Sequence, residues 1–375
     1  MQAQDRPSIW ILDGSVAVTG AFISARDMAR ALRNEVDVVL VLPDTSRICT
    51  DELTDFAAVY HLPIRPLRRR LEDIALYMPF LLLALLRLHR QITRTGAKVL
   101  LVNDFYLMQG PLLRLVGYRG RMLTWVRIDP TGFGRAGKVW LAVASRLSDH
   151  ILAVSRHIQH LLPASMPNQL LYDSVSAEFL SPPAAPRGPD GYDFVFLGNY
   201  IEGKGQDTAI TAMADLIRKV PAARLRFHGD DMGLPKNRTY LAALKQQAKR
   251  LGVSEVVKFG GFTSHPRSIL DGAFAALTLS RSESFSRTVL EACACGLPVI
   301  ATRCGGPEEI VEHGRTGLMI PIDDARACAE AMHDLCRDPK KAAEMGAAGR
   351  ARVIQIFAPD PFATRLKEFV LENTL

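Results

Sequence analysis

The sequence lacks the cysteine pairs that structural zinc sites use. Its six cysteines form no Cys-x-x-Cys pair, and the neighbouring Cys293 and Cys295 would point to different faces of a helix. No zinc site is therefore expected, and unpaired thiols in an apolar setting favour a reducing cytoplasm. Residues 1–14 also lack the basic region and long apolar run of a secretion signal. We therefore expect a cytoplasmic protein.

Low-complexity tracts and repeats of fixed period are absent as well. The chain has 375 residues, with 48% hydrophobic and 23% charged side chains, as in soluble globular proteins. This length exceeds one ordinary core and predicts two domains. The formal net charge is +7. Residues 1–180 hold 21 Lys and Arg, of which 19 are Arg, against 16 Asp and Glu.

Short β-branched runs alternate with helical patterns along the chain, which predicts parallel α/β sheets covered by helices. A Pro- and Gly-rich stretch, 181–191, reads as a linker between domains 1–180 and 192–359. Two such sheets joined by a hinge would form a cleft between the carboxyl ends of their strands. The candidate strands are 36–43, 97–104, 121–129, 149–155, 192–198, 223–230, 256–262, 274–280 and 298–303.

An apolar helix with a glutamate at its centre follows the strand 274–280. Ser286 is a suitable N-cap for it, and Gly296 and Pro298 would end it. Glu283 lies in the loop before this helix, and Glu291 lies inside it. First-turn amides attract an anion, so the pattern indicates a nucleotide, with phosphates on the amides and ribose on Glu291. The alternative is an ion pair between Glu291 and Arg287.

The stretch SESFSRTVLEACACGLPVIATRCGGPEEIVEHGRTGLMIP, residues 282–321, resembles the signature of the family-4 retaining glycosyltransferases. Weaker matches occur at 196–210, 228–231, 257–262 and 148–155. The resemblance implies the GT-B fold, an α/β fold with two Rossmann-like parallel-sheet domains that face each other across a cleft. We also expect the last helix, about 360–375, to pack back on the first domain.

The resemblance assigns roles to residues around the two glutamates. Glu283 would reach the donor sugar, and Glu291 would bind the ribose hydroxyls. Backbone amides around Phe285 and Ser286 would face the sugar and the phosphates. Family members usually have glycine at the position of Ser286, where serine still offers its amide but requires an ordinary φ. The donor-binding set expected in this loop is Ser284, Phe285, Ser286 and Arg287.

A second donor-binding segment is GNYIEGKG, residues 198–205. Gly198 ends a strand, and Lys204 would place an ammonium group beside the diphosphate. Many relatives carry arginine where this chain has Asn199, so Lys204, together with Arg287, would carry more of the diphosphate charge. The alternative for Lys204 is a solvated lysine in a turn.

The first domain offers fewer candidates. Residues 13–32 begin with a strand and a loop and continue as a helix, for which Ser24 is a possible N-cap. Gly20 would let the backbone approach a ligand closely. Relatives often have a histidine at the end of a later strand, where this chain has Arg127 and Asp129. That pair would either act on the acceptor side or form a structural salt bridge.

The resemblance implies transfer of a hexose, with retention, from a UDP- or GDP-sugar to a glycan or lipid-linked acceptor, in bacterial-type polysaccharide or lipopolysaccharide synthesis. No cofactor and no nucleic-acid partner are expected. The sequence holds no Asp-x-Asp triplet, a motif by which metal-dependent enzymes hold sugar diphosphates, so metal independence is expected. The alternatives are a sugar-nucleotide epimerase of the same fold and a non-enzymatic two-lobed sugar-binding protein.

Residues 65–94 combine seven arginines and two acids with an uncharged stretch at 74–86. That stretch has 13 residues, fewer than the roughly 20 that cross a membrane. The pattern suits a segment lying on an anionic membrane, with Arg68, Arg69 and Arg70 attracting the lipid. The protein would then be peripheral on the inner face of the cell membrane. The alternative is a core helix whose arginines face water.

Overall fold

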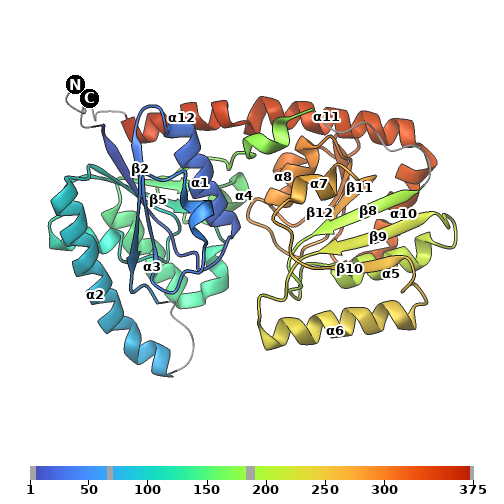
Figure 1. The fold of residues 1–375 in the computed structure, drawn as a ribbon, viewed down its shortest axis with the longest axis horizontal. Helices are drawn as coiled ribbons and strands as arrows, with labels where there is room; N and C mark the ends of the chain where they lie inside the picture. Colours follow the sequence, from blue (N-terminus) through green and yellow to red (C-terminus); the bar gives the residue numbers. More distant parts are fainter. Residues whose placement is uncertain (1–5, 66–70, 183–190, 372–375) are drawn as a thin grey trace. The chain divides into compact units, whose positions relative to one another are not determined.

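The chain forms two compact units in a computed structural model that describes residues 6–65, 71–182 and 191–371 (Figure 1). The first unit comprises Met1–Ser174 and Pro359–Leu375, and the second comprises Val175–Ala358. The division falls before the expected linker 181–191, of which 183–190 lie outside the described residues.

Hydrogen bonds explain why residues 175–182 belong to the second unit. The amide of Val175 donates to the carbonyl of Phe357 at 2.8 Å. The Arg350 guanidinium donates to the carbonyls of Phe179 and Leu180, at 3.3 and 2.6 Å. The predicted boundary at residue 180 is therefore a few residues too late.

The first unit contains a seven-stranded parallel sheet with the order β3-β2-β1-β4-β5-β6-β7. Its strands are mostly buried, as expected where helices cover both faces. The strands are β1 (Ser8–Leu12), β2 (Asp37–Pro43), β3 (Ala58–Leu62), β4 (Val99–Val102), β5 (Arg121–Val126), β6 (His150–Ala153) and β7 (Gln169–Leu170).

The helices of the first unit include the last helix of the chain. They are α1 (Gly20–Leu32), α2 (Leu71–Thr95), α3 (Gly134–Leu147), α4 (Arg156–Leu161) and α12 (Pro359–Leu371), with 3-10 turns η1 (Thr50–Leu53), η2 (Pro111–Val116) and η3 (Pro130–Phe133). Helix α12 packs against α1. Its Phe362 stacks on the buried Trp125, with ring centroids 6.2 Å apart.

The second unit contains a six-stranded parallel sheet with the order β10-β9-β8-β11-β12-β13. The strands are β8 (Tyr192–Leu197), β9 (Ala223–His228), β10 (Val257–Gly260), β11 (Ala275–Thr278), β12 (Val299–Thr302) and β13 (Gly317–Ile320). The helices are η4 (Ala177–Leu180), α5 (Gln206–Leu216), α6 (Pro235–Arg250), α7 (Pro266–Leu270), α8 (Arg287–Ala294), α9 (Pro307–Ile310), α10 (Ala325–Arg337) and α11 (Pro339–Phe357).

Two parallel Rossmann-like sheets confirm the predicted fold class. Each of the nine candidate strands overlaps a strand of the structure. The strand expected at the start of 13–32 is wrong, because β1 ends at Leu12 and the loop begins there. Four strands escaped prediction: β1, β3, β7 and β13.

Candidate functional site

The strand order of the second unit opens a ligand-binding position between β8 and β11. Strand β8 pairs with β9 on one side and with β11 on the other, so the loops after β8 and β11 leave the sheet toward opposite faces. Parallel sheets bind ligands at such a point, outside the carboxyl ends of the strands. Lys204 follows β8, and Glu283 follows β11.

Lys204 and Glu283 form an ion pair at this position. The Lys204 Nζ lies 2.7 Å from Glu283 Oε1, and Ser280 Oγ donates to the same oxygen at 2.7 Å. The two side chains keep 34% and 17% of their surface exposed, so the pair remains open to solvent. Lys204 is thus held by Glu283 and is not merely a solvated lysine in a turn.

Glycines bring the Lys204 loop close to the end of β11. Gly203 and Gly205 on either side of Lys204 have φ of 91° and 86°, a left-handed conformation that glycine adopts at no steric cost. A Cβ on Gly205 would lie 2.1 Å from the carbonyl oxygen of Leu279. The close approach of the loop to β11 therefore requires glycine at 205.

Asn199 joins neighbouring loops instead of presenting a cation. Its Oδ1 accepts from the Asp230 amide at 3.1 Å, and its carbonyl accepts from Gln206 Nε2 at 2.9 Å. Gly198, which precedes it, donates its amide to the His228 carbonyl at 2.9 Å. In the structure, Asn199 and Gly198 therefore hold together the loops that follow β8 and β9.

The loop between β11 and α8 lies tightly against the loop after β12. The Gly306 amide donates to the Glu283 carbonyl at 2.8 Å, and a Cβ on Gly306 would lie 2.3 Å from the Phe285 Cα. Phe285 itself is buried against Phe357, with ring centroids 5.6 Å apart. Ser284, which lies between Glu283 and Phe285 in the sequence, is half-buried. This packing fixes the backbone that leads into α8.

Ser286 contradicts two expectations, the ordinary φ and the N-cap role. Its φ is 87° and its ψ is 85°, so it does not adopt an ordinary φ. It precedes α8, but its side chain makes no capping hydrogen bond. The physical reason is that the chain turns sharply from the packed loop into the helix. A left-handed residue makes that turn, and in this conformation the serine hydroxyl does not cap the first amides.

Glu291 and Arg287 lie one turn apart on α8 and form the ion pair that was the alternative for Glu291. Arg287 Nε lies 3.6 Å from Glu291 Oε1, and each side chain is 10% exposed. The Arg287 Nη2 also donates to Ser176 Oγ at 3.1 Å. Binding of ribose by Glu291 stays a prediction.

The first unit has an equivalent position between β1 and β4, because β1 pairs with β2 and β4. The buried Asp13 and Asn103 follow these strands, and Asn103 Nδ2 donates to Asp13 Oδ2 at 2.5 Å. Burial raises the pKa of the Asp13 carboxyl. Burial also raises the pKa of the adjacent Asp104 to about 7, although its Oδ1 accepts from the amides of Phe105 and Arg127.

Sequence reasoning missed this buried polar group of Asp13, Asn103 and Asp104. A signal was present, since an acid directly follows the apolar run of β1 and an Asn-Asp pair directly follows that of β4. Polar residues at the carboxyl ends of buried parallel strands are candidates for ligand contacts.

The expected pair of Arg127 and Asp129 is not formed. Arg127 instead donates to both carboxylate oxygens of Asp173, at 3.1 and 2.6 Å, and to Ser24 Oγ at 2.7 Å. Asp129 accepts from the amide and hydroxyl of Thr131 at the start of η3. The reason is that β5 ends at Val126, and the chain then turns Asp129 away into η3.

The N-cap expected at Ser24 is wrong as well. Helix α1 begins at Gly20, and Thr19 Oγ1 accepts from the Phe22 amide at 3.3 Å. Ser24 lies inside the helix, and its hydroxyl donates to the Gly20 carbonyl at 2.9 Å. Gly20 is exposed in the first turn of α1, where amides lack helical partners.

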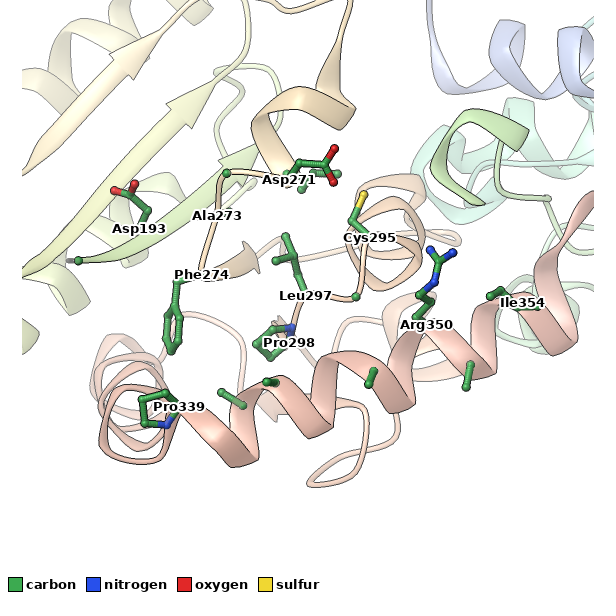
Figure 2. A pocket seen from close by; sticks show the side chains of 18 residues that line it. Asp193, Asp271, Ala273, Phe274, Cys295, Leu297, Pro298, Pro339, Arg350 and Ile354 are labelled. Carbon is green, nitrogen blue, oxygen red and sulfur yellow. The ribbon is translucent and has the colours of Figure 1, made fainter. Parts of the chain in front are cut away.

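Among the cavities of the second unit, two differ in their position relative to the candidate site. The larger, of about 570 Å³, lies between α11 and the turns before β11 and β12; Figure 2 shows Arg350 and Ile354 on its helical side and Phe274 on one turn. It is at the amino ends of the strands, opposite to Lys204 and Glu283. A cavity of about 410 Å³ adjoins the Lys204 loop and is lined by residues that include Glu202, Lys236 and Arg281. The smaller cavity is therefore the one beside the candidate site.

Within the described residues, no three His, Cys, Asp or Glu side chains are grouped so that they could hold a metal ion. The same part of the chain contains no helix with the length and apolarity needed to cross a membrane.

Comparisons with known proteins identify the class of the fold. The structure of HepE from Anabaena, solved in complex with UDP-glucose, matches with a TM-score of 0.82 and 20% identity, over 97% of this chain and 99% of that one. Sucrose-phosphate synthase from Thermosynechococcus elongatus matches with a TM-score of 0.80 and 21% identity, over 98% of each chain. The chain has the GT-B fold.

Sequence comparison identifies the family. Residues 182–352 match the family model of glycosyl transferases group 1. A GDP-mannose-dependent alpha-(1-6)-phosphatidylinositol monomannoside mannosyltransferase of Mycolicibacterium smegmatis is 38% identical over 165 residues, 42% of this chain and 41% of that protein. The chain thus spans less than half the length of such curated relatives. The match to glycosyl transferases group 1 covers most of the second unit, and it confirms the resemblance seen in the sequence.

Proposed function

We propose that this protein is a retaining, metal-independent glycosyltransferase that moves a hexose from a UDP- or GDP-sugar to a glycan or lipid-linked acceptor. The observation that carries the proposal is the ion pair of Lys204 and Glu283, 2.7 Å apart, where the loops after β8 and β11 leave the sheet toward opposite faces. A cation and a carboxylate at that position suit a sugar diphosphate, which carries negative charge at one end and hydroxyls at the other. The group 1 family of the second unit supports this assignment.

In the proposed reaction, the bond between the anomeric carbon and the diphosphate oxygen breaks as an acceptor oxygen bonds to the same face of the carbon. The acceptor proton passes to the leaving diphosphate. Lys204 stabilises the charge that accumulates on that group, with the first-turn amides of α8 and with Arg287. Glu283 positions the sugar, and Glu291 holds the ribose hydroxyls. Asn199, which lacks the charge of arginine, leaves Lys204 as the principal cation.

The donor sugar, the biosynthetic role, the location and the acceptor side are part of the same proposal. The mannosyltransferase name of one relative and the lipopolysaccharide core biosynthesis name of another, LpsE of Rhizobium meliloti, support a hexose donor and a role in cell-surface polysaccharide or lipopolysaccharide synthesis. We place the protein in the cytoplasm, peripheral on the inner face of the membrane, with no resident cofactor. We place Gly20 with the donor-binding residues. On the acceptor side we place Asp129 and, less directly, Arg127 through Asp173 and Ser24.

Incubation with radiolabelled UDP- and GDP-sugars, without an acceptor and with EDTA present, tests this function. We expect slow release of free sugar. Lys204→Ala should lower kcat tenfold or more with a smaller change in KM, whereas Lys219→Ala, which removes an exposed lysine of the same unit, should change neither. Conversion of the sugar to its epimer, binding without turnover, or loss of activity in EDTA would each contradict the proposal.

A further inference from the structure

Helix α2 (Leu71–Thr95) lies along one side of the first unit (Figure 1). It has two apolar faces, of which the protein covers one. The covered face repeats at helical spacing and joins the core beneath the sheet of the first unit. It consists of Leu81, Ala84, Leu85, Leu88 and Ile92, each at most 7% exposed. These residues already supply the core contacts that an amphipathic helix needs.

The second face is apolar although it is exposed. Leu82 and Leu86 are 56% and 51% exposed, Met78 is 63%, Leu76 is 53% and Leu83 is 40%. A helix on the surface of a water-soluble domain ordinarily carries polar side chains there. No charged side chain occurs between 74 and 86, so this face, the leucine face below, forms a continuous exposed apolar patch.

Arginines continue the leucine face toward the end of the helix. Arg87, Arg90 and Arg94 are exposed, and their spacing from Leu83, at four, seven and eleven residues, places them along one stripe. The salt bridges among the described residues do not include any of the three. Arg65, by contrast, pairs with Asp44 at 2.5 Å and lies over the ring of Phe80. Arg68, Arg69 and Arg70 lie outside the described residues.

We propose that the leucine face docks on the surface of an anionic lipid bilayer, with its leucines at the boundary between head groups and acyl chains and Arg87, Arg90 and Arg94 on lipid phosphates. Charge complementarity selects this occupant. Exposed arginines that form no salt bridge within the described part of the chain lie beside an uncharged apolar stripe, and this combination matches a bilayer with anionic head groups. A second copy of the chain would carry the same positive charges, so it fits less well. The inference deepens the proposed function. It depends on that function in one respect, the placement of the acceptor in the same membrane.

The leucine face lies within the segment 65–94 that the sequence assigns to the membrane surface, and its exposed leucines add apolar contact to the attraction of the arginines. Insertion of aliphatic side chains is insensitive to salt, whereas attraction of surface charges falls as salt screens them. Binding should therefore weaken, but not vanish, at high salt.

Co-sedimentation of the full chain with vesicles of phosphatidylglycerol and phosphatidylcholine tests the proposal. We expect the wild type to bind, and Leu82→Ser/Leu86→Ser to bind at least tenfold more weakly at low and high salt. Arg87→Gln/Arg90→Gln should weaken binding at low salt and remove most of its salt dependence. The control Val139→Ser, which removes an exposed apolar side chain of α3 that is 60% exposed, should bind as the wild type does.

Failure of the wild type to bind, or equal binding by the double leucine variant, would overturn the proposal. Self-association that the leucine variant abolishes, without vesicle binding, would assign this face to a second copy. A thermal-shift assay with UDP and GDP on the same samples keeps the two proposals separate. If the wild type binds neither UDP nor GDP, the proposed function alone is contradicted. Vesicle binding would still decide the role of the leucine face.

Discussion

Ser286 has a backbone conformation that costs a side-chain-bearing residue free energy. Its φ of 87° lies in the left-handed region, where a Cβ approaches the following carbonyl at a cost of roughly 1–2 kcal/mol. Its side chain makes no capping bond that would offset this cost. The serine hydroxyl lies 3.4 Å from Thr288 Oγ1, a long contact that contributes little.

We predict that Ser286→Gly raises the free energy of unfolding by about 1 kcal/mol, since glycine relieves the strain but adds some freedom to the unfolded chain. Urea unfolding at neutral pH measures the change. Ser286→Ala, which keeps the Cβ, is the matched control and should give no gain. A glycine variant no more stable than the alanine variant would show that the loop already accommodates the Cβ.

At the scale of single elements, the end of β4 carries a carboxyl group that folding makes harder to ionise. The pKa of Asp104 rises from 3.8 to about 7, mainly through burial. Between pH 3.8 and about pH 7, Asp104 in the folded chain therefore keeps a proton that it has lost in the unfolded chain. The free energy of unfolding falls as the pH rises through the window, and the full penalty is present above it.

Replacing this carboxyl by an amide should remove the penalty. Asp104→Asn keeps an oxygen for the amides of Phe105 and Arg127. Since each pKa unit corresponds to about 1.4 kcal/mol, its gain at pH 8 should exceed its gain at pH 4 by up to about 4 kcal/mol. Denaturant unfolding at both pH values, with the exposed Asp51→Asn as control, measures this difference. The same gain at both pH values would mean that Asp104 stays ionised in the fold.

Elements with long β-branched or apolar runs could be predicted from the sequence, whereas others could not. Strand β7 has two residues, and β13 reads as Gly-Leu-Met-Ile, so neither carries enough pattern to be recognised alone. Helix starts were less predictable than strands. Ser24 has the right residue type for an N-cap, but Thr19 caps α1, and Ser24 lies inside the helix, where its hydroxyl accepts from Arg127.

The candidate site could be predicted where strand ends marked it. Lys204 and Glu283 are 79 residues apart in sequence, yet each lies in a loop after a predicted strand and in a segment that carries the family resemblance. Only some of the partners were predictable. Arg287 and Glu291 are four residues apart on one helix, so their ion pair could be expected from the sequence as an alternative. The choice of Asp173 by Arg127 depends on the positions of loops that local pattern does not encode.

At the scale of the whole molecule, the last helix completes the first unit. Phe362 of α12 is 5% exposed and stacks on Trp125. Phe362→Ala should therefore cost about 3–5 kcal/mol through lost burial and the cavity left behind. Urea unfolding followed by tryptophan fluorescence measures this loss, and Phe262→Ala, at a side chain 62% exposed, is the control. Equal stability of the two variants would mean that α12 contributes little to the core.

The position of α12 also has a consequence for biosynthesis. The first unit lacks α12 until the ribosome has translated the whole of Val175–Ala358. Until then the nascent first unit stays incomplete. The apolar surface that Phe362, Leu366 and Phe369 later cover is exposed and can contact other chains. Chaperones that shield apolar surface should therefore engage this nascent chain late in translation, and release should follow once the last helix leaves the exit tunnel.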